Sequence, residues 1–113
     1  MKRYEMVKAH EDFNEIIKKG HKISGKYIHI FFLKKDFPKP NFGIAVGKKY
    51  GNAVERNNIK RKYRNIIDNN KFLFKNNYNY IIMIKREAKN IDYLILEKDI
   101  VNILGKENYE KQI

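Results

Sequence analysis

The 113-residue chain contains no cysteine, which excludes both a disulfide framework and a thiolate metal site. Long hydrophobic runs are also missing. The longest, YIHIFFL at 27–33 and YIIMI at 80–84, are far shorter than the roughly 20 apolar residues that cross a membrane. The N-terminal stretch MKRYEMVKAHEDF carries charge throughout and lacks the apolar segment of a secretory signal. We therefore expect a cytoplasmic protein.

Acidic residues are scarce relative to basic ones. The chain has 13 Asp and Glu against 25 Lys and Arg, which gives a formal net charge of +12. A hydrophobic fraction of 42% with 13% aromatics is typical of a folded globule, and the length fits one domain. A small domain with this charge excess is expected to bind a polyanion, either nucleic acid or an anionic membrane.

Proline occurs only twice, at Pro38 and Pro40, in a stretch that we interpret as a loop between two strands. Hydrophobic periodicity and turn residues predict, in order, helix, strand, strand, helix, strand and helix, over residues 10–19, 26–34, 42–47, 53–68, 78–85 and 91–104. The last helix is assigned from its apolar positions, namely Ile91, Leu94, Ile95, Ile100, Ile103 and Leu104. This order predicts an α/β fold, a two-layer sandwich in which a small mixed sheet of three to four strands packs with helices.

Positive charge is concentrated in the stretch GNAVERNNIKRKYRNII at 51–67 and just before it. Between Lys48 and Arg64 there are seven Lys or Arg and one Glu, so this part carries 7 − 1 = +6 of the total +12. Asn52 is a suitable N-cap for the predicted helix. On a helical wheel of about 100° per residue, one arc holds Arg56, Asn57, Lys60, Arg61 and Arg64, and the neighbouring arc holds Ile59, Tyr63, Ile66 and Ile67. One side can pack on a sheet while the other stays cationic.

A solvated charged face, a membrane-surface helix and a nucleic-acid interface all fit a basic helix. Acids are nearly absent here and Arg is preferred at 56, 61 and 64, which argues against a plain solvated face. Arg makes bidentate, planar contacts with phosphate. A membrane-surface helix needs a broad apolar face, but the apolar arc of this helix is needed for the core. Nucleic acid is therefore the favoured partner.

The stretch FGIAVGKKYGNAVERNNIKRKYRNII at 42–67 resembles the signature region of the bacterial ribonuclease P protein subunit. That family typically shows a G-[IL]-x-V strand, a Lys-Lys pair, G-[NK]-A-V and then R-N-x-x-K-R-x-x-R. The matching positions are Gly43, Val46, Lys48, Lys49, Gly51, Ala53, Val54, Arg56, Asn57, Lys60, Arg61 and Arg64. The segments EDFNEIIKKG, KYIHIFFL and YIIMIKREA extend the resemblance over most of the chain. Asn58 and Tyr63 depart from the pattern, which commonly has a basic and an apolar residue there.

The resemblance implies a single ribonuclease P protein domain over residues 1–113, with a left-handed strand-helix-strand crossover. It implies a protein cofactor of a catalytic RNA that removes the 5′ leader from precursor tRNA, with Mg²⁺ held by the RNA and none by the protein. Both RNAs would be partners, and no obligate protein partner is implied. The residues implied to bind the catalytic RNA are Lys48, Lys49, Arg56, Asn57, Lys60, Arg61 and Arg64. A leader-binding cleft between the first helix and the sheet would involve Phe13, Ile17, Phe31, Lys85 and Arg86.

Other interpretations remain open at this level. Without the resemblance, Phe13, Ile17 and Phe31 would be assigned to plain core packing. A ribosomal or RNA-chaperone protein would explain the charge but not the full spacing of the motif. A self-sufficient protein nuclease would need positioned acids, bases or metal ligands. The three histidines, His10, His21 and His29, show no metal-binding spacing, and no catalytic motif is present, so no catalytic residue is assigned to the polypeptide.

Overall fold

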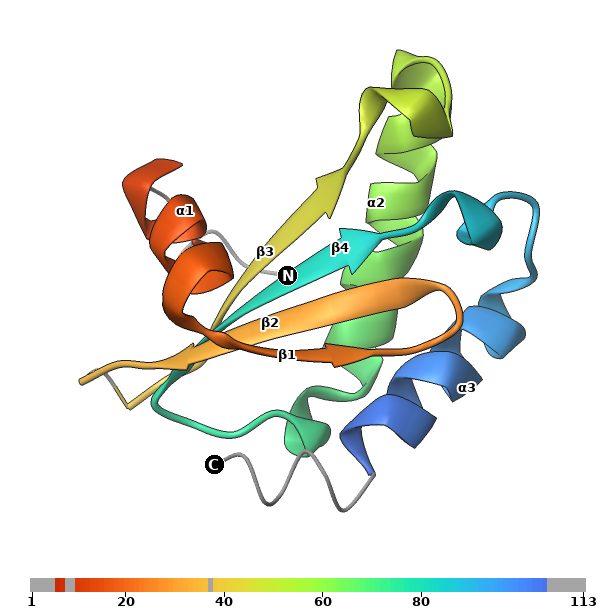
Figure 1. The fold of residues 1–113 in the computed structure, drawn as a ribbon. Coiled ribbons are helices and arrows are strands. Elements are labelled where there is room, and N and C mark those ends of the chain that lie inside the picture. The colour runs from red at the N-terminus through yellow and green to blue at the C-terminus, as the bar shows by residue number, and fades with distance from the viewer. Residues whose placement is uncertain (1–5, 8–9, 37, 106–113) are drawn as a thin grey trace.

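A four-stranded sheet of strand order β1-β2-β4-β3 forms the centre of the molecule (Figure 1). The computed structural model describes residues 6–7, 10–36 and 38–105. The strands are β1 (His21–Ser24), β2 (Ile28–Lys34), β3 (Asn41–Val46) and β4 (Tyr78–Ile84). The helices are α1 (His10–Lys19), α2 (Ala53–Asn69) and α3 (Tyr93–Leu104). Short 3-10 turns lie at η2 (Lys48–Tyr50), η3 (Lys71–Leu73) and η4 (Arg86–Ala88).

The sheet is mixed, and β4 is the strand that has one antiparallel and one parallel neighbour. β2 pairs antiparallel with both β1 and β4, whereas β3 pairs parallel with β4. The chain leaves β3, runs through α2 behind the sheet as seen in Figure 1, and returns as β4, which makes this crossover left-handed. Nearly all such connections are right-handed, so this feature is a strong marker of the fold. The predicted mixed α/β architecture is confirmed.

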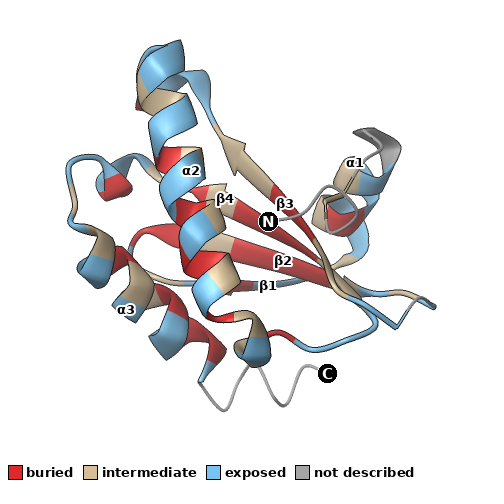
Figure 2. Cartoon of the chain, turned by 180° about the vertical axis from the view of Figure 1, so that it is seen from behind, coloured by how far each residue is buried: buried red, intermediate tan, exposed pale blue. Residues whose placement is uncertain are grey.

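The larger core lies between the sheet and the helices α2 and α3 (Figure 2). Alternate residues of the strands face it, including Ile30 and Phe32 of β2 and Tyr80 and Ile82 of β4, all fully buried. Because side chains alternate along a strand, the residues between them face the opposite side of the sheet. From α2 the core receives the four residues of the predicted apolar arc, Ile59, Tyr63, Ile66 and Ile67.

A smaller core on the opposite face of the sheet is covered by α1. Its buried members are Ile16, Phe31 and Ile81. Gly43 makes room for this packing, because a Cβ there would lie 2.5 Å from Cε2 of Phe13. The α1 helix covers only one end of the sheet, and no other helix of the described residues lies over this face (Figure 1).

Two elements differ from the sequence-based expectation. The short strand β1 was not predicted, and only its Ile23 is buried. In α3 the buried side chains are Leu96, Ile100, Ile103 and Leu104, whereas Leu94 is 72% exposed and Ile95 is 47% exposed. Leu94 and Ile95, two of the apolar positions from which this helix was predicted, therefore do not belong to its buried face. Within the described ranges, no helix is long and apolar enough to span a bilayer.

Candidate nucleic-acid interface

The basic helix α2 begins at a complete capping box. The side chain of Asn52 accepts a hydrogen bond from the Glu55 backbone N–H at 2.9 Å, and the Glu55 carboxylate accepts one from the Asn52 backbone N–H at 3.0 Å. These two bonds satisfy backbone donors that the start of a helix leaves without partners. The predicted cap at Asn52 is confirmed, and the 17-residue helix that follows is firmly defined at its N-terminal end.

We use the name basic surface for the residues that were predicted from the sequence to bind the catalytic RNA: Lys48, Lys49, Arg56, Asn57, Lys60, Arg61 and Arg64. Lys48 and Lys49 are exposed on η2, which is anchored by the buried Tyr50. On α2, Asn57 and Arg61 are exposed and the other three are partly buried. The buried apolar arc lies against the sheet (Figure 2), so the packing of α2 determines which way the cations point. The structure thus brings all seven residues onto η2 and one helix.

The cations of the basic surface have no acidic partner within the described part of the chain. The ion pairs found there join Lys71 to Asp68 at 3.4 Å and Lys89 to Glu55 at 3.1 Å. Hydrogen bonds from the Asn52 backbone and from Lys89 lower the pKa of Glu55, so this carboxylate is ionised but already engaged. Arg56 has a hydrogen bond within the chain, because its Nη1 donates to the Gly51 carbonyl at 2.7 Å. The other cations of the basic surface are therefore available to an external anion.

A second surface, here called the α1 surface, lies beside α1 on the other face of the sheet. It contains three of the five residues predicted for the leader-binding cleft, namely Phe13, Ile17 and Phe31. Phe13 and Ile17 are partly buried, and Phe31 is 9% exposed. The Nζ of Lys22 lies 5.8 Å from the centroid of the Phe31 ring. All three side chains belong to the smaller core, so they have a packing role there.

Lys85 and Arg86 lie farther along the sheet. Phe31 pairs with Ile81 in the β2–β4 register, and Lys85 follows four residues later, roughly 13 Å away at about 3.3 Å per residue. Lys85 donates from Nζ to the Gly25 carbonyl at 2.8 Å, and Arg86 is exposed. These two cations therefore flank the α1 surface at a distance.

His29 was not assigned to any site from the sequence. It lies on β2 between Phe31 and the end of the sheet at which Lys85 follows β4. It follows the strand alternation of Phe31, two residues away, and its Nδ1 lies 2.6 Å from the Ser24 hydroxyl. Burial, and then the charges of Lys22 and Lys85, lower the pKa of His29, while Glu87 has a smaller opposite effect. Strand alternation could have placed His29 on the same face of the sheet as Phe31. Its contact with Ser24 was not predictable from spacing.

Comparison with known proteins assigns the chain to one family. The chain matches the ribonuclease P family over residues 1–108. It is 34% identical over 104 residues to the ribonuclease P protein component of Streptococcus agalactiae, covering 92% of this chain and 94% of that protein.

Solved structures agree with the sequence match. The ribonuclease P protein of Staphylococcus aureus superimposes with a TM-score of 0.82 at 28% identity, covering 96% of both chains. That of Thermotoga maritima superimposes with a TM-score of 0.81 at 25% identity, covering 88% of this chain and 94% of the other. With its mixed sheet, its left-handed crossover and its cationic α2, this chain belongs to the ribonuclease P protein family.

Proposed function

We propose that this chain, as the protein subunit of a tRNA-processing ribonuclease P, grips the catalytic RNA through the basic surface. The observation that carries the proposal is the unneutralised charge of α2 and η2. Arg61 is exposed, and no carboxylate within the described ranges pairs with it. Folded RNA is recognised largely through its shape and its phosphates, and guanidinium groups on a rigid helix suit that task.

The 5′ leader of precursor tRNA is assigned to the α1 surface. An extended strand with unpaired bases binds where cations follow its backbone and flat side chains meet its bases. Phe13 and Ile17 are partly accessible there, and Lys22, Lys85 and Arg86 supply positive charge nearby. This surface and the basic surface belong to elements packed on opposite faces of the sheet, so two RNA segments can be held at the same time.

Cleavage itself is assigned to the RNA subunit together with its Mg²⁺ ions. The described residues of this chain form no group of three or more His, Asp or Glu side chains that could hold a metal ion. Because the described residues offer no such group, no step is derived through a protein-bound ion. The polypeptide contributes binding and orientation of the two RNAs, and we expect the assembled particle to work in the cytoplasm.

Reconstitution tests this proposal directly. The purified chain is combined with the cognate catalytic RNA and precursor tRNA at low Mg²⁺ concentration, and release of the leader is followed on a gel. We expect cleavage at the mature 5′ end to be much faster with the chain than with the RNA alone, and no cleavage by the chain alone. Cleavage by the RNA-free chain would overturn the assignment of catalysis. Recovery of mainly ribosomal RNA in a pull-down from lysate would support a ribosomal role instead.

A further inference from the structure

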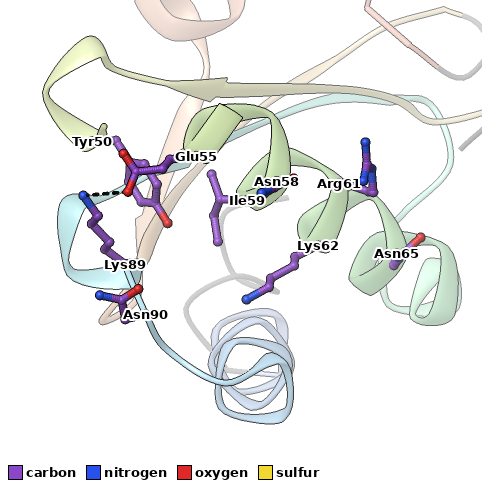
Figure 3. A pocket seen from close by; sticks show the side chains of 9 residues that line it. All are labelled: Tyr50, Glu55, Asn58, Ile59, Arg61, Lys62, Asn65, Lys89 and Asn90. Carbon is purple, nitrogen blue, oxygen red and sulfur yellow. Dashed lines mark ion pairs between the residues drawn. The ribbon is translucent and has the colours of Figure 1, made fainter. Parts of the chain in front are cut away.

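The polar residues that line the hollow of about 400 Å³ along α2 do not meet at one point (Figure 3). Asn58 and Asn65 are seven residues apart on its wall, which is about 10 Å along the helix at 1.5 Å per residue. Arg61 points away from the side of α2 on which Lys62 and Asn90 lie. Polar and flat side chains do gather on the opposite face of the sheet, around His29.

His29 lies within a patch formed by neighbouring strands. Its cross-strand neighbours are Ser24 of β1 and Met83 of β4. In the next row toward α1, Lys22 of β1 is opposite Phe31. Because alternate residues of a strand point to the same face of the sheet, the side chains of these two rows share one surface.

His29, and not Phe31, offers an accessible ring in this patch. Phe31 is 9% exposed and is packed in the smaller core with Ile16 of α1. His29 is partly exposed, and its Nδ1 lies 2.6 Å from the Ser24 hydroxyl. This contact fixes the ring at one edge before any RNA arrives. A group held in advance loses less conformational freedom on binding.

Lys22 supplies a cation on one side of His29. Its Nζ lies 5.8 Å from the centroid of the Phe31 ring. Phe31 is two residues from His29 along β2, about 6.6 Å away at 3.3 Å per residue. The ammonium group of Lys22 is therefore close to the His29 ring but does not cover it.

Lys85 supplies a cation on the other side. Its backbone N–H donates to the Tyr27 carbonyl at 2.9 Å, which continues the β2–β4 ladder. Its Nζ donates to the Gly25 carbonyl at 2.8 Å. Lys22, His29 and Lys85 thus lie on a diagonal across β1, β2 and the end of β4. Successive members are about 8 Å apart, given about 4.8 Å between strands and about 6.6 Å between alternate residues.

The ring of His29 is uncharged at neutral pH. Burial, and then the charges of Lys22 and Lys85, lower the pKa of His29 below its usual 6.5, while Glu87 has a smaller opposite effect. A neutral imidazole offers a flat face to a ligand and no positive charge. Unpaired bases stack on flat side chains, and cations beside them meet the phosphates of the same strand.

We propose that His29 is a specificity-determining residue, whose ring stacks on one unpaired base of the leader while neighbouring phosphates lie at Lys22 and Lys85. The inference rests on the proposed function, because it names the side chain through which the α1 surface distinguishes leader-bearing substrate from mature tRNA. Sheets that carry flat side chains on an open face bind single-stranded RNA in this way in other folds.

The two histidines of the sheet provide a matched test. His29→Val removes the ring but keeps a residue that suits a strand, and His29→Phe keeps a flat ring without a titrating group. His21 is exposed on β1 and is opposite Phe32, whose side chain faces the larger core. His21→Val therefore makes the same change away from the patch. Thermal unfolding of the three variants checks that each is folded.

The first measurement uses the isolated chain. The ring protons of His29 and His21 are followed by NMR while single-stranded pentaribonucleotides of each base, or an abasic pentamer with the same sugar-phosphate backbone, are added. We expect at least one base-bearing pentamer to move the His29 signals upfield saturably, and the abasic pentamer and the His21 signals to show no such shift. Equal shifts with the abasic pentamer would reduce the patch to a phosphate site, and no saturable shift at His29 would also overturn the proposal.

The second measurement uses the holoenzyme reconstituted with the catalytic RNA, and compares its affinities for precursor tRNA and mature tRNA. We expect His29→Val to lower the preference for precursor tRNA about fivefold or more, starting from the lower end for a stacked base. His29→Phe and His21→Val should keep this preference. An equal loss in His29→Phe, or equal preferences of His29→Val and His21→Val, would overturn the proposal.

Failure of the proposed function would look different. If the unaltered chain gave the holoenzyme no preference for leader-bearing substrate, the assignment of the leader to the α1 surface would fail. The titration with pentaribonucleotides would still decide whether the His29 ring stacks on a base.

Discussion

Replacing Arg61 by alanine should weaken binding of the catalytic RNA and flatten its dependence on salt. If each of the six cations of the basic surface met one phosphate, the slope of log K against log salt concentration would be about −4 to −5. Removing Arg61 should bring this slope closer to zero by about 0.7–0.9. A hydrogen bond to a charged group contributes about 1.5–3 kcal/mol, so affinity at low salt should fall at least tenfold.

Arg61 is a better choice than Arg56, whose guanidinium also tethers the Gly51 carbonyl and so has a structural role. Filter binding of the RNA at a series of KCl concentrations measures the slope. Lys75→Ala is the control, because it removes the same unit charge from an exposed position away from α2. An unchanged slope for Arg61→Ala, or an equal change for Lys75→Ala, would refute a phosphate contact at Arg61.

Three further predictions concern the core and the α1 surface. The Tyr63 hydroxyl is buried with no hydrogen-bond partner among the described residues, so Tyr63→Phe should stabilise the fold by about 1–3 kcal/mol; a midpoint of urea unfolding that does not rise would contradict this. The pKa of His29 is lowered in the folded chain. As the pH falls below about 6.5, His29 therefore binds a proton in the unfolded chain before it does so in the folded chain. The free energy of unfolding should therefore drop between pH 7.5 and 5.5, and His29→Gln should reduce that drop; equal pH dependence in both proteins would exclude His29 as its source. Phe13 is the partly accessible aromatic of the α1 surface, and Phe13→Leu keeps an apolar group in the smaller core but removes the ring, so it should lower the preference for leader-bearing substrate over mature tRNA by about 1 kcal/mol, the lower end for a stacked base. Equal losses on both substrates would indicate a folding defect.

Features with local causes were predictable from the sequence. The start of α2 follows from Asn52 and its spacing to the first helical residues, and the inward face follows from the periodicity of Ile59 and Tyr63. Both depend on residues within a few positions of each other. The basic surface was predictable for the same reason, because η2 and α2 follow one another closely in the chain.

Features with long-range causes were not predictable. The strand β1 has a single buried residue, Ile23, so it shows no alternation that could identify it. The ion pair between Glu55 and Lys89 joins residues of different elements, and no spacing rule connects them. In α3, Leu94 and Ile95 continue an apolar pattern that is wider than the face the sheet can cover. The left-handed crossover could be expected only from the resemblance to a known family.

The place of β4 between β2 and β3 affects how the protein is made. While the chain emerges from the ribosome, β1 and β2 can form a hairpin. Among the described residues, β3 pairs with no other strand until residues 78–84 follow it, and its earlier partner is the single bridge from Met6 to Phe42. The whole cationic helix is therefore synthesised before the sheet that orients it can close. Ordering of the RNA-binding face must then await the C-terminal part of the polypeptide, so a truncated nascent chain would carry the charge of this protein without its shape.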